Sequence, residues 1–389
     1  MVPVELRGFA FVSMSTMLML TGAVAALYGP LLLTLAKTFH VSLPQAGIVV
    51  SVHFVGALVG VLVGWVAMKR LTGSVVVVVT LGCFGLGALC VALSSTWSVF
   101  LVGVFVVGVG FGGLDFSLNT LLTRTDLAGR PRRLSVGNAG YGLGAVIGPL
   151  LVILVQPHNY PLVFGGAAGA ALLLATLSRG IIAPPQTSEG RAHELNSLHP
   201  GRRSILFTFI VAYVLYVSAE SSASGWIAAQ LHGEGHGSSL GSLITGGFWL
   251  GLALGRMVGG PMHRRVGYRA LVLGGLSVGL VCAGIAFFGA AAPYSYPALG
   301  VAFALVYPMG LVWYTTLCPH DRNGLALLIF CMMAGGVLGP GVESLMVSLV
   351  GIRAVPLVIG AFVAADLATF ASARRFHPPR AGVATVETK

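Results

Sequence analysis

Charged side chains are scarce in this sequence. Asp, Glu, Lys and Arg make up 8% of its 389 residues, while hydrophobic residues make up 56%. A soluble globular chain carries roughly 25% charged residues. With so little polar surface, a folded monomer could not cover an apolar core in water, whereas in lipid the apolar surface already has its solvent. The composition therefore excludes an ordinary soluble domain and predicts an integral membrane protein.

Sequence signatures of several chemical functions are missing as well. There is no GxxxxGK[ST] loop, so we do not expect ATP-driven transport. No nucleophile lies beside a base and an orienting group, so we expect neither an enzyme nor catalytic residues. The five cysteines show no CxxC and no metal-ligand spacing. The run His232-x-Glu234-x-His236 could bind a metal, but a polar loop is the simpler interpretation. We expect no metal and no cofactor.

The net charge of +11 does not predict a nucleic-acid partner, because the basic residues lie in short loops between apolar stretches. Alternate loops and the two termini carry 19 of the 22 Lys and Arg residues. The opposite loops carry only Lys37 and Arg353, and Arg256 lies inside an apolar stretch. Cytoplasmic loops are enriched in Lys and Arg. We therefore expect both termini and the central linker in the cytoplasm, for a protein of the cell inner membrane.

Twelve apolar windows account for most of the chain, and each is close to the roughly 20 residues that a membrane-crossing helix needs. They lie at about 8–36, 45–67, 74–94, 98–122, 134–157, 161–182, 204–230, 240–262, 269–292, 294–316, 324–350 and 354–374. A polar stretch at 184–203 separates the sixth from the seventh. We predict an all-α membrane fold with an N-terminal bundle (1–183), a linker (184–203) and a C-terminal bundle (204–389).

The two halves share motifs at similar positions. A glycine followed by a basic loop ends both the second window, at Gly64, and the eighth, at Gly259. A Gly-x-x-x-Gly-Pro element occurs in the fifth window, at 144–149, and in the eleventh, at 335–340. Both pairs are offset by nearly half the chain. A parallel repeat of six plus six helices about an axis along the membrane normal is the plan of major facilitator transporters.

The chain resembles the major facilitator superfamily over essentially its whole length. The loop after the eighth window is similar to the family's G-x-x-x-D-R-x-G-R-[RK] signature, with His263 in the position of the acid. The matching loop after the second window has Met68 there. In the family this acid caps a neighbouring helix and locks one conformation, so the N-terminal latch is in question. The basic residues assigned to the latch are Lys69, Arg70, Arg256, Arg264 and Arg265.

Within the superfamily, three stretches resemble the fucose permease-like sugar:proton symporters. They are 20–47, 108–122, and the pair 216–226 and 246–256. The stretch 108–122 is Gly-rich and contains an acid followed by an Asn four residues later. The resemblance implies a sugar substrate and H⁺ as the coupling ion. One position departs from the group, because Gly29 stands where the group carries a helix 1 acid linked to proton coupling.

Ionisable side chains inside a membrane are costly, so each is a candidate functional residue. Asp115 and Asn119 are four residues apart and share a helix face, where they could bind a hydroxyl-rich solute. A low dielectric favours the protonated acid, so Asp115 could take up a proton. Pairing with a cytoplasmic arginine such as Arg124 is the structural alternative. Glu220 shares a face with Tyr216, and the serines that follow predict a weakened helix there.

Other candidates have a less definite role. Aromatic rings can stack on the C–H faces of sugars, and the candidates for this contact, with one amide, are Asn138, Tyr141, Trp249, Tyr307 and Tyr314. Arg256 either braces the basic loop or binds an anionic solute. Weaker candidates are Glu343, Asp366 and His53, of which the histidine is better explained as a packed core residue.

Two transport functions fit the sequence. The first is a rocker-switch symporter that moves a sugar or similar small polar solute inward with protons, with Asp115 and Glu220 as coupling carboxylates. The second is a proton-coupled efflux antiporter for drugs or metabolites, suggested by the Gly-Pro element at 144–149, although a structural repeat explains that element equally well. A receptor or a membrane enzyme finds no support. We expect a monomer whose partners are the small-molecule substrate and the lipid bilayer.

Overall fold

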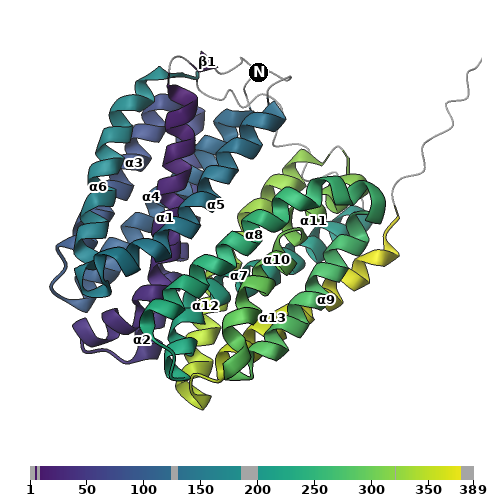
Figure 1. The fold of residues 1–389 in the computed structure, drawn as a ribbon. Coiled ribbons are helices and arrows are strands. Elements are labelled where there is room, and N and C mark those ends of the chain that lie inside the picture. Colours follow the sequence, from purple (N-terminus) through teal and green to yellow (C-terminus); the bar gives the residue numbers. More distant parts are fainter. Residues whose placement is uncertain (1–4, 7–8, 124–129, 185–199, 320, 378–389) are drawn as a thin grey trace, which may run out of the picture.

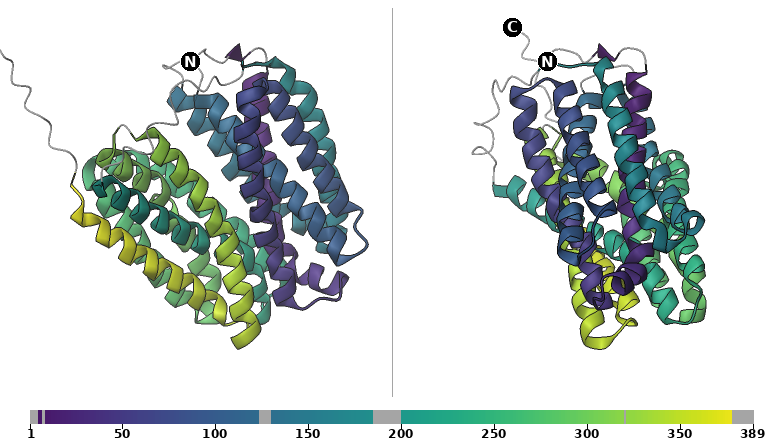
Figure 2. Two further views of the ribbon diagram at one scale, coloured as in Figure 1. Left: turned by 180° about the vertical axis from the view of Figure 1, so that it is seen from behind. Right: turned by 90° about the vertical axis from the view of Figure 1, so that its left-hand side faces the viewer.

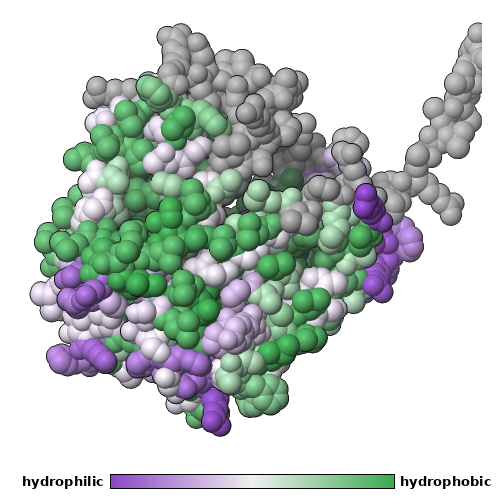
Figure 3. All heavy atoms as spheres, in the orientation of Figure 1, coloured by the Kyte–Doolittle hydropathy of each residue, from purple (hydrophilic) through white to green (hydrophobic). Residues whose placement is uncertain are grey.

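A computed structural model describes residues 5–6, 9–123, 130–184, 200–319 and 321–377. In these residues, eleven helical spans are long and apolar enough to cross a membrane, and a shorter apolar helix, Ala139–Val155, supplies the fifth crossing. The prediction of an all-α membrane fold with twelve crossings is confirmed. Exposed leucines such as Leu86, Leu172 and Leu349 lie on the outside of the bundles. Figure 3 shows hydrophobic side chains gathered across the middle of one face, as expected for contact with lipid.

The N-terminal bundle consists of six helices and a small strand pair. The helices are α1 (Ala10–Thr38), α2 (Leu43–Arg70), α3 (Gly73–Ala92), α4 (Trp97–Thr123), α5 (Arg130–Val155) and α6 (Tyr160–Leu177). Strand β1 (Glu5–Leu6) pairs antiparallel with β2 (Ile181–Ile182). This pairing ties the start of the chain to the segment that follows α6. Short 3₁₀ turns, η1 (Pro157–Asn159) and η2 (Ser178–Gly180), flank α6.

The C-terminal bundle also makes six crossings. Its helices are α7 (Pro200–Gly233), α8 (Ser238–Val266), α9 (Tyr268–Ala286), α10 (Ala292–Phe303), α11 (Val306–Leu317), α12 (Arg322–Val350) and α13 (Ala354–Ser372). The 3₁₀ turns η4 (Gly289–Ala291) and η5 (Ala373–Arg375) precede α10 and follow α13. Helix α7 begins four residues before the window expected from hydropathy, inside the stretch we assigned to the linker.

The helices pack in the same way within each bundle. Helix α1 packs on α5 as α7 packs on α12, α2 packs on α4 as α8 packs on α10, and α3 packs on α6 as α9 packs on α13. The bundles meet through α2 with α12, α5 with α8, and α1 with α7. Figures 1 and 2 show the two bundles side by side, the first in purple to teal and the second in green to yellow. These contacts follow the two-fold repeat that the sequence motifs predict.

The two bundles are close together at one end and diverge toward the other (Figures 1 and 2). We call the end that carries β1 and the turns after α2, α6 and α8 the basic end, because most of the described Lys and Arg residues lie there. The other end is the opposite end, and it carries the turn between α1 and α2. At the opposite end the Ser51 hydroxyl of α2 donates a 2.8 Å hydrogen bond to the Val337 carbonyl of α12.

The repeated Gly-x-x-x-Gly-Pro element is a close-packing device. A Cβ on Gly144 or Gly148 of α5 would collide with backbone carbonyls of α1. A Cβ on Gly335 or Gly339 of α12 would collide in the same way with carbonyls of α7. Small residues let membrane helices approach this closely. The same packing in both halves accounts for the element without an antiporter role.

The tenth crossing is broken, where the sequence predicted one continuous helix over 294–316. Helix α10 ends at Phe303 and α11 begins at Val306. Proline at 308 has no N–H to donate to the carbonyl of Ala304, and its ring clashes with a carbonyl at that position. The mean hydropathy of this window is high enough for one continuous span, so hydropathy did not reveal the break.

Two tyrosines of α7 pair with the carbonyls around this break. The Tyr213 hydroxyl donates to the Tyr307 carbonyl at 2.6 Å, and the Tyr216 hydroxyl donates to the Phe303 carbonyl at 3.3 Å. A buried carbonyl without a partner is costly in a membrane. The two hydroxyls therefore stabilise the broken helix.

Replacing either tyrosine by phenylalanine should destabilise the protein. Each change removes one buried hydrogen bond to a backbone carbonyl, at a cost of about 0.5–1.5 kcal/mol. Thermal unfolding in detergent should show a lower Tm for Tyr213→Phe and for Tyr216→Phe. Tyr294, which is 81% exposed, provides the matched control Tyr294→Phe. Equal Tm values for all three variants would contradict the role of the hydroxyls.

Helix α7 itself is continuous, which corrects our expectation of a weakened segment after Glu220. It runs unbroken through the serines. The Ser218 hydroxyl donates to the Val214 carbonyl at 2.8 Å, and the Ser221 hydroxyl donates to the Val217 carbonyl at 2.7 Å. A serine that bonds to the carbonyl four residues earlier satisfies its hydroxyl inside the helix. The discontinuity lies in the tenth crossing instead.

Candidate functional site

Five polar side chains from both bundles lie near one another where the bundles face each other. They are Asp115 of α4, Tyr141 of α5, Glu220 of α7, Arg256 of α8 and Tyr307 of α11, and we call them the central cluster. Tyr141 interacts electrostatically with Glu220, Asp115 and Arg256, and Tyr307 interacts with the same three groups. All five are half-buried. The predicted candidates Asp115, Glu220, Tyr141 and Tyr307 are therefore brought together, and Arg256 joins them.

Asp115 and Asn119 lie on one face of α4, as their spacing predicts. The Asn119 amide donates to the Asp115 carboxylate at 3.1 Å and to the Asp115 carbonyl at 2.9 Å. The amide thus orients the carboxylate without adding a charge. Arg124, the alternative partner considered for Asp115, lies outside the described residues.

Glu220 and Arg256 form the charged part of the central cluster. Glu220 interacts with the Arg256 charge and with the Tyr216 hydroxyl, and Tyr216 interacts with both. Inside a membrane an opposite charge favours the ionised carboxylate. Arg256 Nε is buried without a hydrogen-bond partner. The structure therefore places Arg256 beside Glu220, within the site, although the sequence assigned it to the latch at the basic loop.

Aromatic rings adjoin the central cluster on both bundles. Tyr141 of α5 meets Trp249 of α8 edge to face, with ring centroids 6.2 Å apart, and meets Phe111 at 6.3 Å. The Trp249 indole N–H donates to the Ser224 hydroxyl of α7 at 3.0 Å, which fixes its ring. Trp249 is 6% exposed. Tyr141 and Trp249 thus bring an aromatic surface from each bundle next to the cluster.

Three other predicted binding residues have different surroundings. Tyr216 is 1% exposed, and its hydroxyl supports the broken helix as well as contacting Glu220. Tyr314 is buried at the end of α11, and its hydroxyl donates to the Asp321 carboxylate at 2.9 Å. This contact places Tyr314 at the start of α12, near the basic end. The Asn138 side chain lies outside the described part of the chain.

The predicted latch residues lie at the basic end. The Lys69 ammonium is 3.2 Å from the centroid of the Trp65 ring, a cation–π contact within one helix. Arg70 and Arg265 are exposed, and the Arg264 side chain is outside the described residues. Among the described residues, Lys69, Arg70 and Arg265 form no ion pair with an acid that could act as a latch.

Two residues that connect elements at the basic end were not identified as candidates from the sequence. Arg269 donates to the Phe376 carbonyl at 3.4 Å, which ties the start of α9 to the end of the C-terminal bundle. Asp321 accepts from the Gly324 amide at 2.8 Å and caps α12. An acid directly before a long apolar helix is the signal that could have identified this cap.

His53 belongs to the packed interior of the N-terminal bundle. It is 1% exposed, and its Nδ1 lies 3.2 Å from the Tyr28 hydroxyl. This position agrees with the core interpretation of the residue. Two acids of the C-terminal bundle, Glu343 and Asp366, are 0% exposed. Neither carboxyl group makes a hydrogen bond.

The structure has two similar helical bundles that meet around a partly exposed polar cluster. This arrangement is typical of secondary transporters built from two bundles. The sequence profile of the Major Facilitator Superfamily matches residues 14–330. The chain belongs to this superfamily. It is a multi-pass membrane protein.

Individual relatives agree with this assignment. The chain is 26% identical over 317 residues to the uncharacterized MFS-type transporter YfkF of Bacillus subtilis (strain 168), which covers 75% of this chain and 77% of that protein. Among solved structures, a bacterial homologue of the human lysosomal transporter Spinster, inward-facing and unoccupied, matches with a TM-score of 0.77 at 13% identity. That match covers 95% of this chain and 97% of the other.

The fucose permease resemblance has a counterpart in the structure comparison. The transporter FucP in its outward conformation matches with a TM-score of 0.64 at 17% identity, over 93% of this chain and 98% of that chain. FucP is described as the fucose:proton symporter of E. coli. At this identity the likeness concerns the fold.

Proposed function

We propose that this transporter is a proton-coupled symporter for a small polar solute, with a sugar as the favoured class, and that it works by alternating access. The central cluster is the observation that carries the proposal. It joins carboxylates of both bundles, Asp115 and Glu220, with the hydroxyls of Tyr141 and Tyr307. Carboxylates and hydroxyls match the donors and acceptors of a hydroxylated solute. The Tyr141 and Trp249 rings can cover its C–H surface.

The cluster suggests different roles for the two carboxylates. Burial of Glu220 favours its neutral form, but the Arg256 charge near it opposes this effect and favours the ionised form. The hydrogen-bond donor to the Asp115 carboxylate is the neutral Asn119 amide. Burial without a cation favours a protonated carboxyl group. We assign proton binding to Asp115 and solute orientation to the Glu220–Arg256 pair.

The proposed location is the cell inner membrane. In the proposed orientation the basic end faces the cytoplasm. Lys and Arg are enriched in cytoplasmic loops. The bundles are joined at the opposite end and diverge toward the basic end, so this structure corresponds to an inward-facing state. The higher TM-score to an inward-facing chain than to the outward-facing FucP agrees with that assignment.

The decisive experiment is transport into proteoliposomes with an imposed pH gradient, against a panel of sugars and of drugs. Inward, proton-driven accumulation of a sugar supports the proposal. Proton-driven extrusion of a drug supports the alternative, an efflux antiporter, which Gly29 in the position of the family's helix 1 acid favours. No flux of any sugar would contradict the proposed substrate class.

Asp115→Asn tests the coupling assignment. Asparagine keeps the size and polarity of the side chain but cannot bind a proton, so gradient-driven accumulation should fall by about tenfold or more. Exchange of labelled for unlabelled solute without a gradient should persist, because it needs no net proton movement. Asp321→Asn is the matched control, since asparagine still caps α12. Gradient-driven accumulation at the wild-type level in Asp115→Asn would show that Asp115 does not couple.

A further inference from the structure

Glu343 of α12 is buried inside the C-terminal bundle and has no part in the central cluster. Its side chain is 0% exposed, and neither carboxylate oxygen makes a hydrogen bond. Ser222 of α7 is close enough to influence the Glu343 carboxyl group. The Ser222 hydroxyl itself has no hydrogen-bond partner. An ionised carboxylate in such a place would be unpaired and very costly. The group is therefore neutral in this conformation and carries a proton.

A chain of polar side chains runs from the neighbourhood of Glu343 toward the opposite end. Tyr296 of α10 is within electrostatic reach of Glu343, and its hydroxyl donates to the side-chain oxygen of Gln230. The Gln230 amide in turn donates to the Glu234 carboxylate at 2.8 Å and to the Ala286 carbonyl at 3.1 Å. Tyr296 and Gln230 are both 0% exposed. We call Tyr296, Gln230 and Glu234 the polar column.

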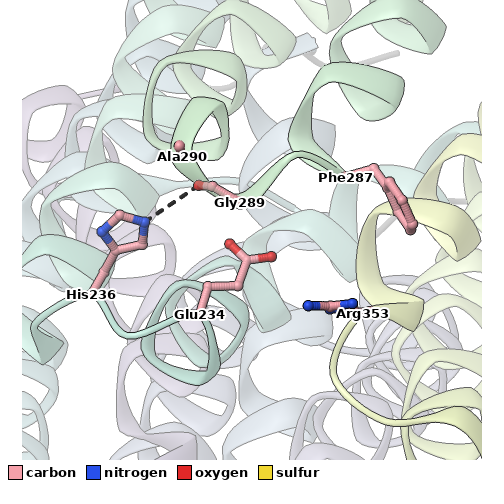
Figure 4. Close-up of a pocket in the computed structure, with 6 residues that line it drawn as sticks. All are labelled: Glu234, His236, Phe287, Gly289, Ala290 and Arg353. Carbon is pink, nitrogen blue, oxygen red and sulfur yellow. Dashed lines mark hydrogen bonds between the residues drawn. The ribbon is translucent and has the colours of Figure 1, made fainter.

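The polar column ends at a pocket on the opposite end of the molecule. The pocket has a volume of about 440 Å³, and its polar lining includes Glu234, His236 and Arg353. Figure 4 shows the Glu234 carboxylate and the Arg353 guanidinium on the walls of this pocket, with His236 bonded to the Gly289 carbonyl. The column thus leads from this surface pocket into the interior of the bundle.

Other ionisable groups on the helices around Glu343 lie elsewhere. On α2, Lys69 and Arg70 are at the basic end, and His53 pairs with Tyr28 within the N-terminal bundle. On α13, Asp366 lies near Tyr213, toward the basic end. On α7, Tyr216 and Glu220 belong to the surroundings of the central cluster, Tyr213 bonds to the tenth crossing, and His232 is exposed. In the described part of the chain, the ionisable group that interacts with Glu343 is Tyr296 of α10, and Gln230 links it to Glu234 of α7.

We propose that Glu343 is a second proton-binding site, filled from the opposite end through the pocket and the polar column. The inference rests on the proposed proton-coupled transport. A proton that arrives along the column adds to the Glu343 carboxylate and gives a neutral acid, and the same O–H bond breaks when the site empties. The next residue, Ser344, lies against Gly47 of α2 where the bundles join. Separation of α2 from α12 would hydrate this region and speed exchange of the proton with the opposite end, and proton symport requires its later release toward the basic end.

Infrared spectroscopy of the full chain in liposomes tests the site without a substrate, because a protonated carboxyl group absorbs apart from an ionised one. Glu343→Gln should remove one protonated-carboxyl component from the spectrum. Asp366→Asn, the matched control, removes another buried acid and should leave that component in place. A spectrum that Glu343→Gln does not change would overturn the proposal.

The route is tested by the rate at which the Glu343 component shifts after transfer to D₂O. Tyr296→Phe and Gln230→Leu should slow this shift while the component itself remains. A shift as fast as in the wild-type protein in both variants would overturn the route.

Transport supplies the second readout. Glu343→Gln should lose gradient-driven accumulation of the panel sugar and keep solute exchange. Accumulation at the wild-type level would overturn a coupling role for Glu343. If no panel sugar moves, the proposed substrate class fails, and the infrared result still decides whether Glu343 binds a proton.

Discussion

Replacing Gly29 by alanine is expected to open the opposite end of the transporter. Gly29 of α1 lies where the two bundles meet, and a Cβ there would collide with the carbonyls of Ser224 and Gly225 on α7. These backbone atoms cannot move aside as a flexible side chain could. An added methyl group in a tightly packed contact costs about 1–3 kcal/mol. The cost applies only when the bundles are joined, so the equilibrium should shift toward the outward-facing state.

A cost of about 1–3 kcal/mol corresponds to a change of about 5- to 150-fold in the ratio of the two states. Spin labels at His40 and Ser348, which are exposed near the opposite end on different bundles, can report the distance between the bundles. Electron-electron resonance in liposomes should show a longer distance for Gly29→Ala. Gly166→Ala is the matched control, because a Cβ there meets nothing within 4 Å. An unchanged distance distribution in Gly29→Ala would contradict the close contact.

The same contact explains why Gly29 departs from the family pattern. Sugar:proton symporters that resemble this chain carry an acid at this position of helix 1. Here any side chain larger than hydrogen would separate α1 from α7 where the bundles are joined. A coupling acid at this point is incompatible with the packing. The proposed proton binding therefore has to involve other carboxylates, and Asp115 and Glu343 are the candidates.

The number of helices and the repeat could be predicted from the sequence, because both depend on local composition. A membrane-crossing helix satisfies its backbone within one segment, so about 20 apolar residues identify it without knowledge of its neighbours. The Gly-Pro elements at 144–149 and 335–340 recur because equivalent helices pack at the same spacing. The grouping of Asp115 with Asn119 followed from helical periodicity alone.

The arrangement of the site could not be predicted in the same way, because it depends on contacts between distant segments. Arg256 lies ten residues before the end of α8, and the sequence alone did not show that Glu220 of α7 is its neighbour. The column from Gln230 to Tyr296 joins residues 66 apart. The break before α11 depends on one proline, and its stabilisation depends on hydroxyls of another helix.

Removing either charge of Glu220 and Arg256 is expected to destabilise the protein, and removing both is expected to cost less than the sum of the two single losses. An exposed ion pair contributes up to about 1 kcal/mol, whereas breaking a fully buried pair costs about 3–5 kcal/mol. Both side chains are half-buried, and their charges interact without a direct ion pair between these two described residues, so Glu220→Gln and Arg256→Gln should each lower stability by about 1 kcal/mol. The double variant should lose less than the sum, because neither charge is left alone in the membrane interior.

A double-mutant cycle measures this difference by equilibrium unfolding in mixed detergent micelles. A coupling energy of about 1 kcal/mol or more between the two positions supports the pair, and strictly additive losses would contradict it. The transport readout separates stability from function. If Glu220 and Arg256 orient the solute, the double variant should be more stable than the sum of the single losses predicts, but solute exchange should stay impaired. Two amides cannot replace the charged hydrogen-bonding groups. Recovery of exchange together with stability would instead give the pair a purely structural role.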